Sequence, residues 1–472
     1  MGRQGDIVTA AIDQDAAAGP ARECLLLDRK DNRRGRLRLT TRSTRDVRGP
    51  MARPSEGLFR GLARGLRFAI GCHAVCGTLD SMSRGDTKAA ASTSEAAVLL
   101  ASARLGGRLR EGVAAAEPDW TKLQRMAVRN GMAPLLCTRL AAECPNLVPP
   151  EATAQMRTDL ARTTAANLAR TQELVAVMAA LEAAGIQAFA YKGPTLAQQA
   201  YGNVALRPFV DLDIFVRRGD VDAASRVLQE RGYERPHDFT PAQAAAFART
   251  EYQLTLRRPQ NGQVVELHWD FAWPHFTVDL DVDRYWDRLS SCAIGGRSIP
   301  CLAPADLVTA LCVHGAKHCW ERLEWAASLA RIVHTHRDID WADLLADASR
   351  RGIRRIVLLG LRLAGDLLPD PLPSAVTDAI DADPTLVRLS AEAAARQMSP
   401  VAPPLDLQKI LSDAAYQMRC RERRTDRLRF LVRFGADPTA EDIEQVRLPH
   451  RFSFAYQLIR PFRLAIKYAR LS

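Results

Sequence analysis

The sequence lacks the Cys-x-x-Cys spacing that is typical of redox and zinc motifs. Its ten cysteines are scattered along 472 residues, and none of them forms a Cys-x-x-Cys motif. Small secreted domains that depend on disulfides are shorter and much denser in cysteine. The pattern therefore excludes a disulfide scaffold. It favours reduced thiols, which predicts a cytoplasmic protein.

Long apolar runs are also missing. The best candidate, "GLARGLRFAIGCHAVCGTL", is interrupted by Arg64, Arg67 and His73. A membrane-spanning helix needs roughly 18 or more consecutive apolar residues. We therefore expect no membrane insertion.

The positive charge of the chain is concentrated near its N-terminus. The net charge is +11, but residues 1–90 hold 17 Lys/Arg against 10 Asp/Glu, so the rest carries only +4. Residues 1–88, rich in Arg, Gly, Ser and Asp without a hydrophobic period, predict a disordered basic extension. Nucleic acid is therefore not the favoured partner. The chain also lacks a Walker loop and a Rossmann fingerprint, which excludes these two kinds of nucleotide site.

The hydrophobic patterning predicts three regions beyond this extension. Apolar residues recur at helical spacing over 89–185 and again over 301–472. Residues 186–300 contain short strand-like runs instead, two of which flank Asn261-Gly262, a strong hairpin signal. We therefore predict an α+β protein, with a small mixed β-sheet domain embedded between mainly helical N- and C-terminal regions.

Two aspartates stand out inside one predicted strand, "FVDLDIFV". Asp-x-Asp is a weak motif, since this chain contains seven of them. Asp211 and Asp213 differ from the others because they lie within a buried apolar run. Alternate strand residues point to the same face, so the two carboxylates would repel each other unless a cation binds between them. This setting indicates a metal site.

Residues on either side of this strand extend the candidate site. Glu266, in the second arm of the predicted hairpin, could bring a third carboxylate from a neighbouring strand. Three carboxylates suit Mg²⁺, a hard cation that prefers oxygen. Upstream, Lys192 and Gly193 follow the first predicted strand and begin a helix, whose N-terminus favours phosphate.

Together these segments resemble a known family. "YKGPTLAQQAYGN", "RPFVDLDIFV", "VVELHW" and "LCVHGAKHCWERLEW" are similar to the bacterial "uncharacterised nucleotidyltransferase" family of the DNA-polymerase-β-like superfamily, often seen with exopolysaccharide genes. The resemblance implies transfer of a nucleoside monophosphate from NTP to a hydroxyl acceptor that the sequence does not identify, with release of pyrophosphate.

The resemblance also implies roles for individual residues. Asp211 and Asp213 would bind two Mg²⁺ ions, and Glu266 would bind the catalytic metal or orient the attacking hydroxyl. Gly193 would approach the triphosphate, while Lys192 and Arg207 would neutralise its charge. Gly193 is followed by Pro194, where the superfamily usually has serine, so that hydroxyl is missing here.

Histidines and tryptophans leave several interpretations open. His314 and His318 lie four residues apart in a predicted helix, and His268 follows Glu266 by two. They could bind zinc, pack between helices, or line the acceptor side of a cleft, which we favour over zinc. Five tryptophans could stack on a base or a sugar but more often belong to a core: Trp269, Trp273, Trp286, Trp320 and Trp325.

Two other functions remain open beside the enzyme. The protein could be a catalytically silent NTP- or partner-binding module of an exopolysaccharide or secretion locus. It could also be a toxin-like enzyme that nucleotidylates tRNA. Convergence of Asp211, Asp213 and Glu266 would favour an enzyme, whereas a Glu266 that points away would favour the silent module.

Overall fold

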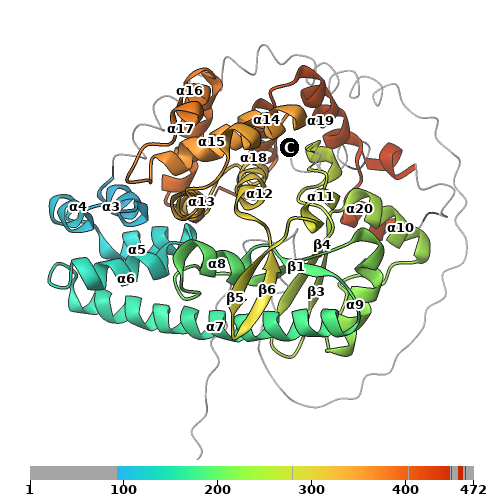
Figure 1. The fold of residues 1–472 in the computed structure, drawn as a ribbon, viewed down its shortest axis with the longest axis horizontal. Helices are drawn as coiled ribbons and strands as arrows, with labels where there is room; N and C mark the ends of the chain where they lie inside the picture. The colour runs from blue at the N-terminus through green and yellow to red at the C-terminus, as the bar shows by residue number, and fades with distance from the viewer. Residues whose placement is uncertain are drawn as a thin grey trace, which may run out of the picture. The chain divides into compact units, whose positions relative to one another are not determined.

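A computed structural model describes residues 93–278, 280–401, 403–404, 406–446, 448, 455–460 and 463 (Figure 1). The predicted basic extension, residues 1–88, lies outside the described residues. The described part confirms the predicted α+β class: one mixed sheet with helical regions before and after it in the chain.

Five helices precede the sheet: α3 (Ser94–Ala103), α4 (Leu109–Ala116), α5 (Trp120–Arg129), α6 (Ala133–Glu143) and α7 (Pro150–Ala183). Thr93 and Asp119 cap α3 and α5, each accepting a hydrogen bond from a backbone N–H of the first turn. Helix α7 runs along the sheet (Figure 1) and contacts three of its strands. Gly185 follows its end with φ +71°, a conformation that glycine adopts without strain.

The sheet has six strands in the order β3-β4-β2-β1-β6-β5. Their bounds are β1 (Ala188–Ala190), β2 (Asp211–Val216), β3 (Gln253–Arg257), β4 (Val264–His268), β5 (Ser290–Ile294) and β6 (Arg297–Cys301). Strand β2 is central, parallel to β4 and antiparallel to β1. The predicted strand before Lys192, the predicted strand "FVDLDIFV" and the Asn-Gly hairpin are all confirmed as β1, β2 and the β3–β4 pair. Strand β2 is shorter than the run that predicted it.

Short helical segments connect the strands: α8 (Gly193–Tyr201), η1 (Arg218–Asp220), α9 (Val221–Glu230), α10 (Pro241–Thr250), η2 (Pro274–Phe276) and α11 (Asp283–Trp286). The hairpin of β5 and β6 was not expected from the sequence. It turns at Gly295 and Gly296, which both have positive φ. Two such residues suit a tight hairpin turn, for which glycine carries no steric penalty.

The helices after the sheet are α12 (Pro304–Lys317), α13 (Leu323–Thr335), α14 (Trp341–Arg351), α15 (Arg354–Gly365), α16 (Ser374–Asp381), α17 (Thr385–Met398), α18 (Leu407–Arg419), α19 (Arg424–Ala436) and α20 (Ala440–Gln445). Helices α12, α13 and α15 pack against one another. In the described part of the chain, no helix combines the length and apolar character needed to cross a membrane.

Strand alternation divides the sheet between two hydrophobic clusters. Leu212, Ile214 and Val216 of β2 belong to a cluster with residues of α7 and α9. Phe215 and, on β1, Phe189 belong to the larger cluster, which also contains residues of the N-terminal helices and of α12 to α17. The opposite faces of the central strand therefore look toward different layers of the protein.

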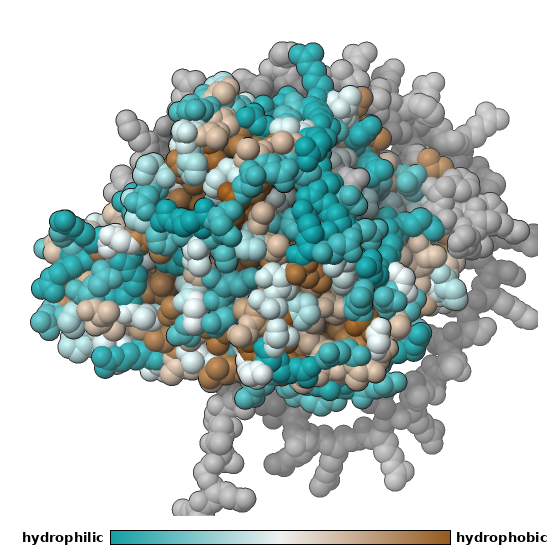
Figure 2. Space-filling model, in the orientation of Figure 1, coloured by the Kyte–Doolittle hydropathy of each residue, from teal (hydrophilic) through white to brown (hydrophobic). Residues whose placement is uncertain are grey.

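Seven cysteines fall within the described residues, and all are buried and free. Burial raises the pKa of each of these thiols above its usual range. On the face drawn in Figure 2, hydrophobic residues form small patches separated by hydrophilic ones.

Candidate active site

The strand register brings three predicted site residues to one face of the sheet. Asp213 is paired with Glu266 across the parallel strands β2 and β4, and His268 follows Glu266 by two residues. Their neighbours Leu212, Val265 and Leu267 are fully buried in the cluster on the other face. Because strand side chains alternate, Asp213, Glu266 and His268 project toward the larger cluster and the helices of the C-terminal region.

These three side chains converge closely enough to hold one cation. His268 Nε2 lies 3.1 Å from Asp213 Oδ1 and 3.4 Å from Glu266 Oε2. One donor atom from each residue lies within 4.8 Å of the others. The buried His268 Nδ1 has no hydrogen-bond partner among the described residues. Two carboxylates and an imidazole form a donor set that fits a divalent cation.

Lys192 forms an ion pair with the same carboxylate oxygen. Its Nζ lies 2.8 Å from Asp213 Oδ1, and both side chains are largely buried. Burial opposes the ionised form of Asp213, but the charge of Lys192 and the hydrogen bond from His268 hold the pKa of Asp213 below its usual range. In turn, Asp213, Asp211 and Glu266 raise the pKa of Lys192 although burial lowers it.

Asp211 borders this group and differs from Asp213 in its protonation. Burial, followed by the charges of Asp213 and Glu266, raises the pKa of Asp211 to about 7. No ion pair is recorded for Asp211 among the described residues, whereas Asp213 has two partners. Asp211 and Asp213 therefore differ in their affinity for a proton, and Asp211 is the weaker acid of the two.

Gly193 begins α8 immediately behind the acids. Its φ is +55°, and a Cβ at this position would lie 3.4 Å from the carbonyl oxygen of Asp211. The positive φ therefore favours glycine in the turn from β1 into α8, and a Cβ there would make only an ordinary contact with the backbone of β2. The N-terminus of this nine-residue helix lies beside the carboxylates, where its free N–H groups could receive an anion.

Arg207 lies in the loop before β2 and is paired with a residue that the sequence did not indicate. Its Nε is 2.5 Å from Glu324 Oε1 on α13, and both side chains are buried. Ser328 also donates a hydrogen bond to Glu324. Arg207 Nη1 is buried without a hydrogen-bond partner in the described chain. One nitrogen of this guanidinium is therefore left without a protein partner from the described residues in the interior.

The histidines of α12 and its C-terminal end lie across from Lys192. His314 and His318 have ring centroids 4.7 Å apart. Burial, followed by positive neighbours that include Lys192, lowers the pKa of both far below the usual value, so both rings are neutral at neutral pH. His268 instead belongs to the donor group of the two carboxylates.

Lys317 is a second site lysine that sequence reasoning missed. It is buried, and its Nζ donates hydrogen bonds to Tyr252 Oη at 3.0 Å and to the Phe271 carbonyl at 3.2 Å. Burial, and then the charge of Lys192, lowers its pKa to about 7. It stood between the two histidines in "HGAKH", but no local pattern indicated that it would turn inward.

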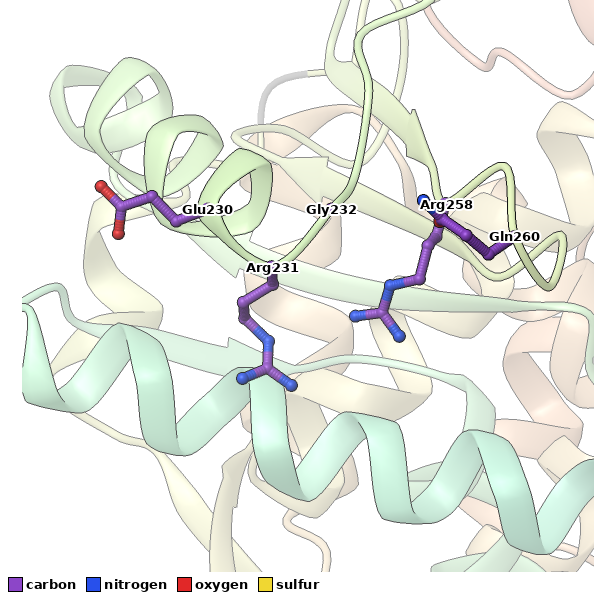
Figure 3. Close-up of a pocket in the computed structure, with 5 residues that line it drawn as sticks. All are labelled: Glu230, Arg231, Gly232, Arg258 and Gln260. Carbon is purple, nitrogen blue, oxygen red and sulfur yellow. The ribbon is translucent and has the colours of Figure 1, made fainter.

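An open depression elsewhere on the sheet domain does not involve these residues. It is lined by Glu230, Arg231, Gly232, Arg258 and Gln260 (Figure 3). Arg231 and Arg258 both pair with Glu173 of α7, with the closest contact at 2.7 Å. In Figure 3 both arginine side chains point toward this helix, whereas Glu230 points away. The depression is thus explained by the ion pairs that attach α9 and the β3–β4 hairpin to α7.

The fold and the site define an α+β protein with a carboxylate and imidazole group able to hold a divalent cation beside a lysine and a helix N-terminus. Comparison with protein families assigns it further. The family model described as uncharacterised nucleotidyltransferase matches residues 116–369, more than half of the chain, and includes every site residue named above. The chain therefore belongs to this nucleotidyltransferase family. Neither a curated protein nor a solved structure matches the chain.

Proposed function

We propose that the protein is a Mg²⁺-dependent nucleotidyltransferase that moves a nucleoside monophosphate from NTP to a hydroxyl group of an acceptor. The observation that carries the proposal is the convergence of Asp213, Glu266 and His268 within 4.8 Å, beside Lys192 and the N-terminus of α8. A family of nucleotidyltransferases supplies the reaction class.

Asp213, Glu266 and His268 would bind a metal ion at the observed group. Asp211 would add a further carboxylate, with two ions expected from the family resemblance. Mg²⁺ bound there would neutralise charge on the phosphates and on the attacking and leaving oxygens. Lys192, Gly193 and the N-terminus of α8 would receive the β- and γ-phosphates, which carry most of the negative charge. Arg207 would add its unpaired Nη1 to the same anion.

Glu266 is suited to the acceptor side of the reaction. Its side chain is 19% exposed, against 2% for Asp213, so an incoming hydroxyl can reach it. Glu266 would orient this hydroxyl and take its proton as the oxygen attacks the α-phosphorus. The new bond joins the acceptor oxygen to the α-phosphorus, the bond from that phosphorus to the β-bridging oxygen breaks, and pyrophosphate leaves with the electron pair.

The inward orientation of Glu266 favours an enzyme over a silent binding module. Its oxygen lies 3.4 Å from His268 Nε2, so a third carboxylate is present at the metal position. The acceptor is a small molecule, a glycan precursor or a macromolecule. A connection to exopolysaccharide synthesis follows from the family resemblance and is part of the proposal.

The test is pyrophosphate release from each of the four NTPs with Mg²⁺ and fractionated cell lysate as the source of acceptor. Asp213→Asn should lower the rate by more than about 100-fold, because even the outer partners of metal ligands cost 10- to 100-fold. Asp220→Asn is the matched control, since Asp220 belongs to another Asp-x-Asp pair and lies outside the site. Equal rates for Asp213→Asn and the wild type would refute the proposal. Labelling of tRNA alone would assign the acceptor to the toxin-like alternative.

A further inference from the structure

Four aromatic side chains form a partly exposed surface next to the acids. They are Trp273, His314, His318 and Trp325, which we call the aromatic surface. The ring centroid of His318 lies 5.6 Å from that of Trp325 and 6.4 Å from that of Trp273, and His314 lies 5.1 Å from Trp325. By contrast, Trp269 and Trp320 are buried core residues.

A continuous row of rings connects this surface to the metal-binding group. Trp273 lies 4.9 Å from Tyr252, and Tyr252 lies 5.7 Å from His268, measured between ring centroids. At the other end, Lys192 is close enough to His314 to lower its pKa. A ligand that lies on the aromatic surface would therefore extend away from the position expected for the phosphates.

Three of the four side chains of the aromatic surface make no hydrogen bond through their ring nitrogens in the described part of the chain. Within the described residues, no recorded hydrogen bond involves the ring nitrogens of His314 or His318 or the indole N–H of Trp325, and none of these atoms is among the buried unpaired ones. The indole N–H of Trp273, in contrast, donates to Glu251 at 3.0 Å. Two neutral imidazoles and one indole are thus free to hydrogen-bond a ligand.

The turn after α12 holds these groups in place under backbone strain. Cys319 and Trp320 both have positive φ, at 54° and 53°, which is costly for residues other than glycine. Trp320 is fully buried and lies against Gly315, where an added Cβ would be only 2.4 Å from its ring. The strained turn fixes the direction in which His318 and Trp325 emerge from the two helices.

The charges around this surface indicate the kind of ligand. After burial, the charges of Lys317, Lys192, Arg322 and Lys409 lower the pKa of His318. Lys409 is paired with Glu321 and Asp413, so Lys192 and Arg322 contribute most of the positive charge on this side. A neutral sugar would gain nothing from these cations, whereas a ligand that carries phosphates would. Flat rings stacked on aromatic side chains are the usual way in which proteins hold a base without reading its identity.

We propose that the aromatic surface binds the nucleoside part of the NTP, with the base stacked on Trp325 and its edge hydrogen-bonded by His314 and His318. This inference rests on the proposed function, since it assumes that NTP is the substrate. The acids and Lys192 account for the metal and the phosphates but not for the base. The base would lie on α12 and α13 rather than on the sheet.

The experiment compares two ligands by equilibrium dialysis with Mg²⁺. An α,β-methylene NTP has all the parts of the substrate but cannot release pyrophosphate, and tripolyphosphate has the phosphates alone. Trp325→Leu should weaken binding of the methylene NTP about tenfold, within the range measured for one base stacked on one aromatic ring, and leave tripolyphosphate binding unchanged. Trp325→Phe should retain most of the affinity because it keeps an aromatic face. Trp341→Leu, a partly exposed tryptophan at the start of α14, is the matched control.

The outcomes separate this inference from the proposed function. If Trp325→Leu binds the methylene NTP as tightly as the wild type does, the base lies elsewhere, and the function proposed for the acids still stands. An equal loss of both ligands would also overturn the inference, because it would indicate a damaged fold and no stacking. If the wild type binds neither ligand with Mg²⁺, the proposed function itself fails.

Discussion

At the level of single residues, Lys192 and a divalent cation would compete for the same oxygen. The ammonium lies 2.8 Å from Asp213 Oδ1, which is also the oxygen that His268 contacts. A metal ion at this position would displace the ammonium, which could then pair with phosphate. Under the proposed function, binding of metal and binding of nucleotide would thereby be coupled through one side chain.

Lys192→Met should therefore change two affinities in opposite directions. Without NTP, the variant should bind Mn²⁺, used as a spectroscopic substitute for Mg²⁺, more tightly than the wild type because no internal cation competes. It should bind tripolyphosphate more weakly, by roughly 10-fold or more, because a charge-assisted contact is lost. Electron paramagnetic resonance and dialysis measure the two. Lys122→Met, which removes a lysine of α5, is the control. A loss of both affinities would contradict the competition.

Asp211 makes the stability of the metal-free protein depend on pH. Its pKa is raised to about 7 from an ordinary value of 3.8, so the folded state holds a proton that the unfolded state releases. The stability that this proton contributes is full below about pH 4 and is lost as the pH rises through about 7. In EDTA, the melting temperature of the wild type relative to Asp211→Asn should fall between about pH 4 and about pH 7 and stay level above that. A parallel pH dependence in the two proteins would contradict the assigned pKa.

The sequence predicted the acids, Lys192 and His268, but not every residue that surrounds them. The alternation of "VDLDIFV" predicted that Asp211 and Asp213 share one face of a strand, and the hairpin around "VVELHW" indicated that Glu266 could reach them from a neighbouring strand. The structure adds that this neighbour is β4, parallel to β2. Glu324 and Lys317 reach the site from α13 and α12 through packing of helices on the sheet. No local pattern encodes such contacts, so these two residues could be found only in the structure.

At the level of elements, the turn between α12 and α13 depends on a glycine. Gly315 has no side chain where the indole of Trp320 packs, and Trp320 also lies against Gly360 of α15. The small residue on α12 therefore admits the large one after it, and the aromatic surface is built on this contact.

Gly315→Ala should destabilise the protein although alanine favours helices. The added Cβ would lie 2.4 Å from the Trp320 ring, and overpacking of a core commonly costs about 1–3 kcal/mol. Urea unfolding measures the free energy. Gly435→Ala, at a helical glycine of α19 with no atom within 4 Å of the added Cβ, should be neutral or slightly stabilising. Equal stability of the two variants would show that the turn adapts.

The two hairpins illustrate which elements a sequence reveals. Asn261-Gly262 stands between two runs of alternating apolar and polar residues. This pattern was enough to predict the hairpin that β3 and β4 form. The β5–β6 hairpin has a comparable signal in Gly295-Gly296, but its strands contain Ser290, Ser291 and Pro300, which are not typical of strands. Pairing of β6 with β1, distant in sequence, supplies the stability that the local residues do not.

For the whole molecule, the larger hydrophobic cluster spans the described regions before, within and after the sheet. The larger cluster joins residues of α3 to α6, the sheet residues Phe189 and Phe215, and the helices after the sheet. Tyr191 of the sheet region donates a hydrogen bond to the Ala310 carbonyl of α12 at 3.0 Å. The regions that carry acids and aromatic surface are therefore one structural unit.

Unfolding by urea should accordingly give a single transition. Circular dichroism, which reports mainly on the helices, and tryptophan fluorescence should give coincident curves. Residues 186–300 expressed alone should not fold, because Phe189, Phe215 and Phe271 would lose the helices that cover them. Two separate transitions, or a folded 186–300 fragment, would contradict a shared core.

The seven buried cysteines of the described residues allow local opening of the structure to be measured at seven separate positions. Each thiol is shielded and has a raised pKa, so an alkylating reagent at neutral pH can modify it only when the surrounding structure opens. They are distributed over α6 and its end, the β5–β6 hairpin, α12 and the residues after it, and the end of α18. The rate at which each cysteine is alkylated therefore reports how often the structure around it opens. Mass spectrometry of the alkylated peptides can rank these rates, show which layer opens first, and test whether nucleotide slows the opening.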